Sequence, residues 1–241
     1  MPAYNEGIHI YENLLKAGNI INRFCPSYEI IAVNDGSTDE TDAGIRQAAD
    51  ENSHIKAISY PENKGKGFAI VTGVNAAKGR YISYLDSDLE LPPKLLKSFI
   101  HIMETQGADI VIGSKQHPDS KLNYPLSRRI MSYGYYVLLK ILFHMNIHDT
   151  QTGIKLFKSE AIKPVACMLH TNGYAFDIEI LAMAHANGCR IAEAPIVLNY
   201  SRDEHRQGRR IHLIDICHTF TDTLRIKKNV RIYMKNHHSD T

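Results

Sequence analysis

The stretch NKGKGFAIVTGVNAAKGRYISYLDSDLELPP, residues 63–93, contains a polar loop, a predicted helix, a predicted strand and an acidic turn. Within residues 66–78, the side chains of Ile70, Val74 and Ala77 fall on one face of a helix. The run RYISYL that follows is β-rich and is bounded by polar residues, which is typical of a short strand. The stretch therefore predicts one α/β unit with polar residues at both ends.

The same alternation of strands and helices runs through the first 115 residues. The predicted strands there are residues 28–33, 55–60, 80–85 and 108–113. Strands that alternate with helices predict βαβ units and a mainly parallel sheet with helices on both faces. Further along, we expect helices at 127–145, 176–188 and 211–234 and strands at 152–157 and 190–200. Because no repeat or low-complexity linker interrupts the pattern, we expect one α/β domain over residues 1–241.

The first seven residues, MPAYNEG, resemble a turn between a strand and a helix. Asn5 is a candidate N-cap for a helix over residues 6–21. A helix entered in this way should follow a strand, yet no residues are left to form one. Either the first strand of the sheet is missing, or the chain begins late, for example at a misassigned start codon, and we favour the second.

Composition and charge exclude several classes of protein. Lys and Arg number 28 and Asp and Glu number 26, so the net charge of +2 gives no reason to expect a nucleic-acid partner. Residues 202–231 are rich in basic side chains, which indicates either an anionic surface or ligand on that side or a solvated basic face. The four cysteines match no metal or redox spacing. The longest apolar run, residues 135–143, is too short to span a bilayer and contains Lys140, so we do not expect an integral membrane protein.

Polar segments follow the predicted strand ends at four places. These are PAYNE (2–6), NDGSTD (34–39), NKGKG (63–67) and DSDLE (86–90). The carboxyl ends of parallel strands meet at one edge of a sheet, where ligands bind. We therefore expect the four segments to converge on one crevice.

Asp86, Asp88 and Glu90 stand at alternate positions just after a predicted strand. If the backbone stays extended, the three carboxylates share a face and could bind Mg²⁺ or Mn²⁺. They could instead cap the helix predicted to begin at Pro92. The stretch alone favours the cap, but its position as the fourth polar strand end favours the metal. The NKGKG segment is either a phosphate-binding loop or a plain loop, and it lacks the full P-loop pattern.

Taken together and in order, several segments resemble the family 2 inverting glycosyltransferases of GT-A fold. They are PAYNE (2–6), VNDGSTDET (33–41), residues 63–93, DIVIGSK (109–115), DTQTGIKLF (149–157) and FDIEILAMA (176–184). The subgroup they resemble most is the polyprenyl-phosphate hexose synthases, of the dolichyl-phosphate mannosyltransferase and glucosyltransferase type. The resemblance covers nearly the whole chain. It implies a nucleotide-binding half at 1–115 and an acceptor-side half at 116–241.

The resemblance also implies roles for individual residues. Those matched to the nucleotide-sugar site are Pro2, Ala3, Tyr4, Glu6, Asp35, Lys64, Gly65 and Asp86, with Arg202 and Arg206 matched ambiguously to a flexible loop. Those matched to the metal are Asp86, Asp88 and Glu90, with Asp88 as the principal ligand. Those matched to the reaction and the acceptor are Asp88, Arg128, Arg129, Asp177 with Glu179, and the segment 151–155.

The chain departs from the family pattern at several places. Asn34 replaces the first Asp of the usual D-D-G-S, and Lys115 stands where Arg is usual. Tyr133 stands where a second basic residue is common, and residues 206–210, RQGRR, lack the Ser and Lys of the flexible loop. The last departure bears directly on the roles of Arg202 and Arg206.

The function that the resemblance implies is metal-dependent, inverting transfer of a hexose from GDP-mannose or UDP-glucose to dolichyl or undecaprenyl phosphate. A phosphate monoester is largely dianionic near pH 7, so this acceptor needs no strong general base. We expect a peripheral protein at the cytoplasmic face of a membrane, with helices 127–145 and 211–234 in the interface. These helices could instead pack in the core or pair two copies of the chain. The alternative functions are transfer to a saccharide hydroxyl, with Asp177 as the base, and a non-catalytic subunit that binds nucleotide sugars.

Overall fold

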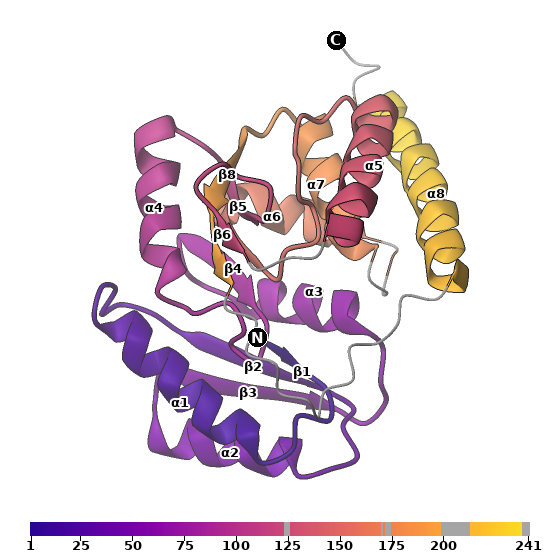
Figure 1. Ribbon diagram of the computed structural model, residues 1–241. Helices are drawn as coiled ribbons and strands as arrows, with labels where there is room; N and C mark the ends of the chain where they lie inside the picture. Colours follow the sequence, from indigo (N-terminus) through magenta and orange to yellow (C-terminus); the bar gives the residue numbers. More distant parts are fainter. Residues whose placement is uncertain (123–125, 170, 172–174, 199–212, 238–241) are drawn as a thin grey trace.

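A computed structural model describes residues 1–122, 126–169, 171, 175–198 and 213–237. In the two long helices of the second half, the described side chains are those of residues 134–143 and 221–235. The chain forms two separate main sheets with helices packed around them (Figure 1).

The first sheet is parallel throughout and has the order β1-β2-β3. Its strands are β1 (Pro2–Ala3), β2 (Ile30–Asp35) and β3 (Ile55–Tyr60). Every residue of β2 is buried, because its alternate side chains meet helices on opposite faces. Ile30 and Ala32 pack with α1 (His9–Asn22) and α2 (Thr41–Glu51), whereas Ile31 and Val33 pack against α3 (Lys66–Ala76).

The first strand of the sheet is present, although it is only two residues long. Pro2 and Ala3 pair with Val33 and Asn34 of β2. The expectation that no residues remain for this strand is therefore wrong. The reason is that a parallel ladder needs only one or two residues in register to be formed, and the MPA segment supplies them.

The second sheet is mixed, with the order β4-β7-β5-β8. Its strands are β4 (Tyr81–Leu85), β7 (Ile154–Lys158), β5 (Ile110–Ser114) and β8 (Ile191–Pro195). β7 runs antiparallel to both of its neighbours, while β5 and β8 are parallel. The helix α4 (Leu95–Gln106) covers one face, and a small sheet joins β6 (Lys121–Leu122) to β9 (Val197–Leu198). The predicted α/β class is confirmed.

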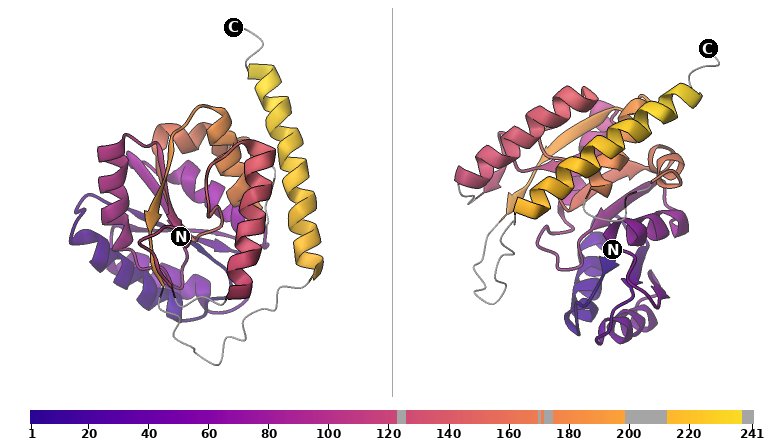
Figure 2. Two further views of the ribbon diagram at one scale, coloured as in Figure 1. Left: turned by 45° about the horizontal axis from the view of Figure 1, so that its top comes forward. Right: turned by 90° about the vertical axis from the view of Figure 1, so that its right-hand side faces the viewer.

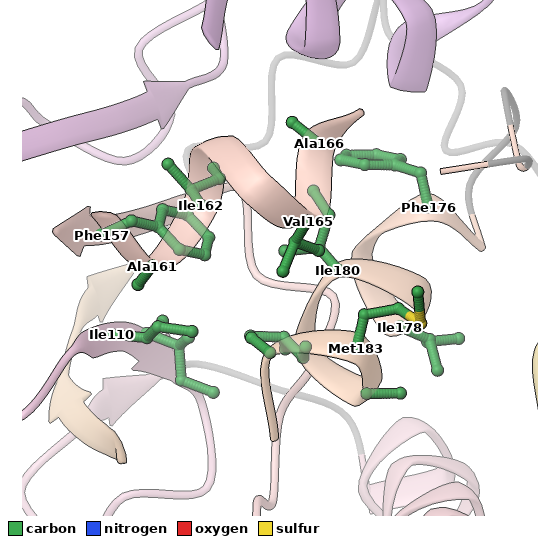
Figure 3. Close-up of a cluster of buried hydrophobic side chains, with 14 of the residues drawn as sticks. Ile110, Phe157, Ala161, Ile162, Val165, Ala166, Phe176, Ile178, Ile180 and Met183 are labelled. Carbon is green, nitrogen blue, oxygen red and sulfur yellow. The ribbon is translucent and has the colours of Figure 1, made fainter. Parts of the chain in front are cut away.

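The largest hydrophobic core lies on the other face of the second sheet. It is formed by α6 (Ser159–Ala166) and α7 (Phe176–Ala186) packed against β5 and β7 (Figure 3). Ile110, Phe157 and Ile162 meet there. Nine consecutive residues of α7, from Phe176 to Ala184, are buried, which explains why its sequence is apolar nearly all round rather than striped.

Two long helices lie side by side on one flank of the second half (Figure 2). They are α5 (Leu126–Phe143) and α8 (Leu213–His237), and the hydroxyl groups of Tyr135 and Thr223 lie 3.0 Å apart between them. Among the described residues, none of the helices combines the length and the apolar character that crossing a bilayer requires.

Candidate active site

Four polar segments lie at the carboxyl ends of β1, β2, β3 and β4, and the first two include the last residues of their strands. We call them the first loop (residues 2–6), the second loop (34–39), the third loop (63–67) and the fourth loop (86–90). Direct hydrogen bonds join the first loop to the second. The amide of Asn5 donates to Ser37 Oγ at 3.0 Å, and Asn5 Oδ1 accepts from the amide of Thr38 at 3.0 Å. Asn5 therefore links two loops, and α1 begins only at His9, so its predicted role as the helix N-cap is wrong.

Asp35 joins the second loop to the third. Its Oδ1 accepts hydrogen bonds from Tyr60 Oη at 2.7 Å and the amide of Lys64 at 2.8 Å. Its Oδ2 accepts from Asn63 Nδ2 at 3.1 Å and the amide of Gly65 at 3.0 Å. Burial, and after it the hydrogen bond to this carboxylate, raises the pKa of Tyr60 above its usual range. Asp35 is buried and holds the third loop in shape, and its predicted contact with a base or ribose stays a prediction.

Gly36 allows the second and third loops to approach each other closely. Its φ is +66°, and a Cβ atom there would lie 2.4 Å from both the nitrogen of Asn63 and the carbonyl carbon of Glu62. Both the backbone conformation and the contact therefore require glycine.

Lys66 joins the third loop to the fourth. Its Nζ lies 2.6 Å from Asp86 Oδ1, and both side chains are partly exposed. Asp86 also faces Gly153, where a Cβ atom would lie 2.1 Å from Asp86 Oδ2. The absence of a side chain at Gly153 thus leaves room for this carboxylate. The four loops are connected in sequence, as their places at the strand ends predict.

The fourth loop is not extended, as the prediction of one shared face for its carboxylates assumed. β4 ends at Leu85, and the amide of Leu89 donates to the carbonyl of Asp86 at 3.3 Å in a turn. Leu89 has a φ of +53°, and Asp88 Oδ1 accepts from the amide of Glu90 at 3.0 Å. Among the described residues, no group of three His, Cys, Asp or Glu side chains is placed to hold a metal ion. The prediction of a shared face fails because the backbone turns where an extended strand was assumed, whereas the metal roles of these residues stay predictions.

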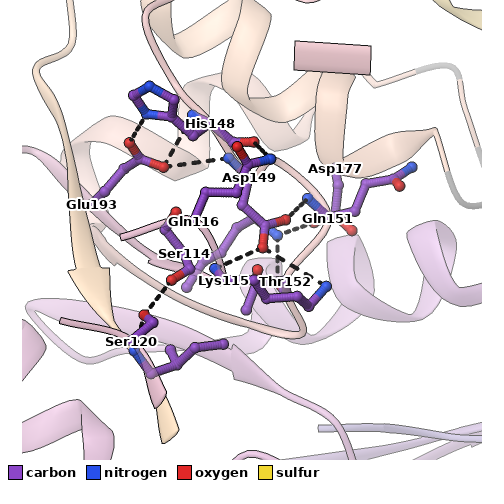
Figure 4. Close-up of polar contacts among 12 residues, drawn as sticks. Ser114, Lys115, Gln116, Ser120, His148, Asp149, Gln151, Thr152, Asp177 and Glu193 are labelled. Carbon is purple, nitrogen blue, oxygen red and sulfur yellow. Dashed lines mark hydrogen bonds and ion pairs between the residues drawn. The ribbon is translucent and has the colours of Figure 1, made fainter. Parts of the chain in front are cut away.

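A second polar network lies beside the fourth loop, around the segment 148–153 (Figure 4). Asp149 Oδ2 accepts from the amide of Lys115 at 3.0 Å, and the Lys115 ammonium lies 3.7 Å away. Glu193 of β8 holds the other side of the segment. Its Oε1 accepts from the amides of His148 at 3.0 Å and Asp149 at 3.3 Å, and its Oε2 lies 2.6 Å from His148 Nδ1. The segment is thus anchored from both sides.

Lys155 and Asp177 form a buried ion pair beneath this network. Lys155 Nζ lies 2.6 Å from Asp177 Oδ1, and their side chains are 0% and 8% exposed. The same oxygen accepts a hydrogen bond from the Tyr84 hydroxyl, and Lys155 Nζ also donates to the carbonyl of Thr152 at 2.7 Å. Burial lowers the pKa of Lys155 and raises that of Tyr84, and the Asp177 carboxylate opposes the first shift and adds to the second. Asp177 therefore anchors the segment 152–155 from below.

The other residues with a predicted role lie in several different parts of the structure. Pro2 and Ala3 form β1, and the ring of Tyr4 is exposed. Glu6 donates its amide to Thr41 Oγ1 at 2.9 Å. Glu179 is buried, and its Oε2 accepts from the amide of Thr171 at 2.9 Å. Arg128 and Arg129 belong to the first two turns of α5, outside the described side chains, and Arg202 and Arg206 lie outside the described residues.

Several residues that shape this edge received no individual role from the sequence. They are Tyr60, Asn63, Lys66, His148, Asp149 and Glu193. Asn63 and Lys66 lie in the segment 63–67, and Asp149 lies in the segment 149–157. Their place in these motifs could have identified them as residues of the site. Glu193 sits in a predicted strand, and nothing in the strand's pattern distinguishes it from an ordinary exposed acid.

Loops at the carboxyl ends of parallel strands, joined around a glycine-containing turn and a helix N-terminus, define an α/β protein of the nucleotide-binding kind. A family model described as glycosyl transferase family 2 matches residues 1–165. The chain belongs to this family, which confirms the resemblance found in its motifs.

Two relatives illustrate the match. The chain is 33% identical over 209 residues to a dolichyl-phosphate beta-glucosyltransferase of Dictyostelium discoideum, across 81% of this chain and 64% of the relative. It is 30% identical over 216 residues to the dolichyl-phosphate beta-glucosyltransferase of Saccharomyces cerevisiae, again across 81% of this chain and 64% of the relative. The chain thus spans a little under two thirds of the length of these curated relatives.

Solved structures share the fold. Glucosyl-3-phosphoglycerate synthase from Mycobacterium tuberculosis, in complex with Mn²⁺, uridine diphosphate and glucosyl-3-phosphoglycerate, matches with a TM-score of 0.65 and 18% identity over 93% of this chain and 76% of that one. Mannosyl-3-phosphoglycerate synthase from Rubrobacter xylanophilus matches with a TM-score of 0.67 and 16% identity over 94% and 70%. The predicted GT-A fold is therefore confirmed.

Proposed function

We propose that the chain transfers a hexose from a nucleotide-diphosphate sugar to a polyprenyl phosphate, of the dolichyl or undecaprenyl type. The single observation that carries the proposal is the continuous set of contacts through the four loops, from Asn5 to Asp86, in a member of glycosyl transferase family 2. Relatives of the chain are named dolichyl-phosphate beta-glucosyltransferases. Because these names specify glucose, we propose UDP-glucose ahead of GDP-mannose as the donor.

The donor diphosphate would lie over the third loop. α3 begins at Lys66, and Gly65 precedes it with a φ of +92°, so the first amides of the helix follow a glycine turn. A helix N-terminus favours anions, and the ammonium groups of Lys64 and Lys66 add positive charge. The exposed ring of Tyr4 and the backbone of the first loop would pack against the nucleoside.

A divalent cation, Mg²⁺ or Mn²⁺, fits the chemistry of the fourth loop. Asp86 already pairs with one cation, the ammonium of Lys66, and its second oxygen lies against Gly153, where any side chain would clash with it. Carboxylates are the ligands that these ions prefer. Asp86 and Asp88 would hold the ion, with Glu90 as a further candidate. When bound, the ion would neutralise the charge of the leaving nucleoside diphosphate.

The acceptor phosphate would approach from the side of α5. Arg128 and Arg129 would hold it in line with the anomeric carbon, since guanidinium groups bind phosphate oxygens in pairs. The dianionic phosphate is itself the nucleophile, and a direct displacement inverts the anomeric centre.

Peripheral contact with the cytoplasmic face of a membrane would bring the lipid to this site. On α5, Ile141 is 65% exposed. On α8, Leu224, Lys228, Arg231 and Lys235 are exposed at helical spacing and form one basic and partly apolar face. Such a face suits the boundary between apolar chains and anionic headgroups.

Transfer to a saccharide hydroxyl is the second candidate, and it requires a general base. The base predicted for that reaction, Asp177, is only 6% exposed, and its Oδ1 is held by Lys155 and Tyr84. This arrangement favours an anchoring role for Asp177 and therefore favours the phosphate acceptor. The third candidate, a non-catalytic subunit, predicts nucleotide-sugar binding without transfer.

The test is transfer of radiolabelled glucose or mannose from UDP-glucose and GDP-mannose to dolichyl and undecaprenyl phosphate in detergent, with Mg²⁺, Mn²⁺ or EDTA. We expect metal-dependent transfer to lipid phosphate that Asp88→Ala lowers by about 100-fold or more, as for loss of a group that stabilises developing charge. Asp50→Ala, a change at an exposed acid of α2, is the matched control and should leave the rate unchanged. Full activity of Asp88→Ala, or transfer only to sugars, would overturn the proposal.

A further inference from the structure

The segment 148–153 connects the end of α5 to the surroundings of the fourth loop. Its last residue, Gly153, lies against Asp86, since a Cβ atom there would be 2.1 Å from Asp86 Oδ2. Its first residue, His148, comes soon after α5 ends at Phe143. A shift of the segment would therefore move backbone atoms beside the carboxylate that we propose as a ligand of the cation.

Glu193 holds the start of this segment. It comes from β8, where it pairs with Ile112 of β5, so its backbone belongs to a sheet rather than to a loop. Its Oε1 accepts hydrogen bonds from two successive amides, those of His148 at 3.0 Å and Asp149 at 3.3 Å. Its Oε2 lies 2.6 Å from His148 Nδ1 (Figure 4). The side chain is only 17% exposed, so these contacts are shielded from water and fix the direction of the chain at this point.

His148 joins the same segment to α5. Its imidazole stacks on the ring of Tyr136, with the centroids 4.4 Å apart and 21° between the planes. Tyr136 is buried, and its hydroxyl donates to Asn146 Oδ1 at 3.0 Å and accepts from Lys140 Nζ at 3.3 Å. The ring of His148 thus lies between a carboxylate of β8 and an aromatic ring of α5.

α5 is the helix from whose side the acceptor phosphate would approach, with Arg128 and Arg129 in its first two turns. The donor would lie at the third and fourth loops. An in-line displacement requires the acceptor and the donor to keep a fixed relative position. The contacts of Glu193 and His148 connect the two sides, because they join α5 to the segment that lies against Asp86.

We propose that Glu193 and His148 are positioning residues for sugar transfer, an inference that rests on the proposed function. Glu193 fixes the start of the segment 148–153. His148, stacked on Tyr136, holds α5 in place relative to that segment. Neither residue needs to touch the reacting atoms, since both act through the backbone and through α5.

The first test compares Glu193→Ala with Glu193→Gln in the transfer of glucose from UDP-glucose to dolichyl phosphate. We expect Glu193→Ala to lower kcat by about 10–100-fold, as misplaced reactants do. Glu193→Gln should keep kcat within about threefold, because one amide oxygen can still accept from both backbone amides. Among the described residues, the hydrogen bonds of the Glu193 carboxylate go to residues 148 and 149, so calorimetry should show nearly unchanged affinity for UDP.

Asp109→Ala is the matched control for a general loss of stability. Asp109 precedes β5, and its Oδ2 accepts from the amide of Arg190 at 2.9 Å. Its Oδ1 lies 2.7 Å from Lys158 Nζ, and its side chain is 25% exposed. The variant therefore also removes a partly buried carboxylate that holds a backbone amide of this sheet, but at the opposite end of β5. Its kcat should equal that of the unaltered chain at temperatures where it is folded.

A double-mutant cycle tests the link to α5. Tyr136→Leu removes the aromatic stack and leaves both backbone hydrogen bonds of Glu193 in place, so it also serves if Glu193→Ala does not fold. We expect it to lower kcat by about tenfold. The double variant Glu193→Ala, Tyr136→Leu should lose little more than the larger single loss, because both changes act through His148.

Hydrogen exchange tests the anchor without any reaction. In Glu193→Ala the amides of His148 and Asp149 should exchange at least tenfold faster, and in Asp109→Ala they should not. Unchanged exchange in Glu193→Ala would overturn the proposal whether or not the chain transfers sugar. If the unaltered chain transfers nothing to lipid phosphate, the proposed function fails, and the exchange rates still decide whether Glu193 anchors the segment.

Three kinetic outcomes would also overturn the proposal. An equal loss of kcat in Asp109→Ala would show that lower stability of the sheet is responsible. A Gln variant as slow as the Ala variant would show that the charge of Glu193 matters rather than its hydrogen bonds. Losses that multiply in the double variant would show that Glu193 and Tyr136 act independently and that His148 does not link them.

Discussion

Lys66 Nζ lies 2.6 Å from Asp86 Oδ1, so the residue that opens α3 is tied to the acid that follows β4. The ammonium stands beside the carboxylate that we propose as a ligand of the divalent cation. Both side chains are about one third exposed, and pairs of this kind contribute up to about 1 kcal/mol. The pair is thus strong enough to weaken the binding of a divalent cation to Asp86. It is also weak enough for a bound cation to displace the ammonium of Lys66.

Replacing Lys66 should make Asp86 a better ligand for the metal. Lys66→Met removes the competing ammonium, so the affinity for Mn²⁺ without nucleotide should rise up to about fivefold. Affinity for UDP should fall in the same variant, because a charge near the diphosphate is lost. Mn²⁺ titration followed by electron paramagnetic resonance, and calorimetry with UDP, measure the two effects. Lys64→Met is the matched control, since the Lys64 ammonium lies over the rings of Tyr60 and Phe68, and an equal gain in Mn²⁺ affinity there would contradict the interpretation.

Asp35 should affect nucleotide binding through the shape of the third loop. In Asp35→Asn one of the two oxygens becomes an amide nitrogen, which cannot accept from the amide of Lys64 or Gly65. We expect a loss of about 1–3 kcal/mol in the free energy of unfolding and weaker binding of UDP. Urea denaturation and calorimetry measure these quantities, with the exposed Asp50→Asn as the control. Weaker UDP binding with unchanged stability would instead indicate a direct contact between Asp35 and the nucleotide.

Much of the first half could be predicted from the sequence, because short β-rich runs are separated there by clear turn residues. β3 occupies residues 55–60 as predicted, and β4 begins one residue later than predicted. The meeting of the first three loops was also predictable, since it follows from the parallel order of β1, β2 and β3. β4 belongs to the second sheet, and the contact of Lys66 with Asp86 brings its loop to the others. α6 was missed because it is only eight residues long and contains Pro164, so it lacks a full helical repeat.

The details of the site were less predictable because they depend on backbone turns and on partners distant in sequence. Asn5 and Leu89 have positive φ values, which alternation patterns do not reveal. Asn5 thereby lies outside the helix and links two loops, and the chain turns after Leu85, so the alternation of an extended strand does not continue into residues 86–90. The antiparallel direction of β7 and the reach of Glu193 to His148 likewise depend on strand order in space rather than on any local pattern.

Removing one partner of the buried ion pair Lys155–Asp177 should lower the free energy of unfolding strongly. In Asp177→Ala the ammonium of Lys155 stays buried without its carboxylate, so the free energy of unfolding should fall by about 3–5 kcal/mol. The double variant Lys155→Met, Asp177→Ala removes both charges and should recover part of that loss. Chemical denaturation measures both variants. A loss below about 1 kcal/mol for Asp177→Ala would mean that water reaches Lys155 and that the pair does not anchor the segment 152–155.

The amino group of Met1 should make stability depend on pH in a defined window. Its pKa is about 5 in the folded chain, against 8.0 for an ordinary N-terminus. Between these values the unfolded chain binds more protons than the folded chain, so stability should rise as the pH increases from about 5 to about 8. Above this window the amine is neutral in both states, and below it the amine is charged in both, so the contribution stops changing. The proper measurement is the difference between two chains that differ only at this amine. A comparison chain with Gly-Ser-Gly-Ser-Gly added before Met1 has an amide at this position, and the stability of the 241-residue chain relative to it should therefore rise with pH across this window. Parallel curves for the two chains from pH 5 to 8 would mean that water hydrates the Met1 amine in the folded protein and contradict the lowered pKa.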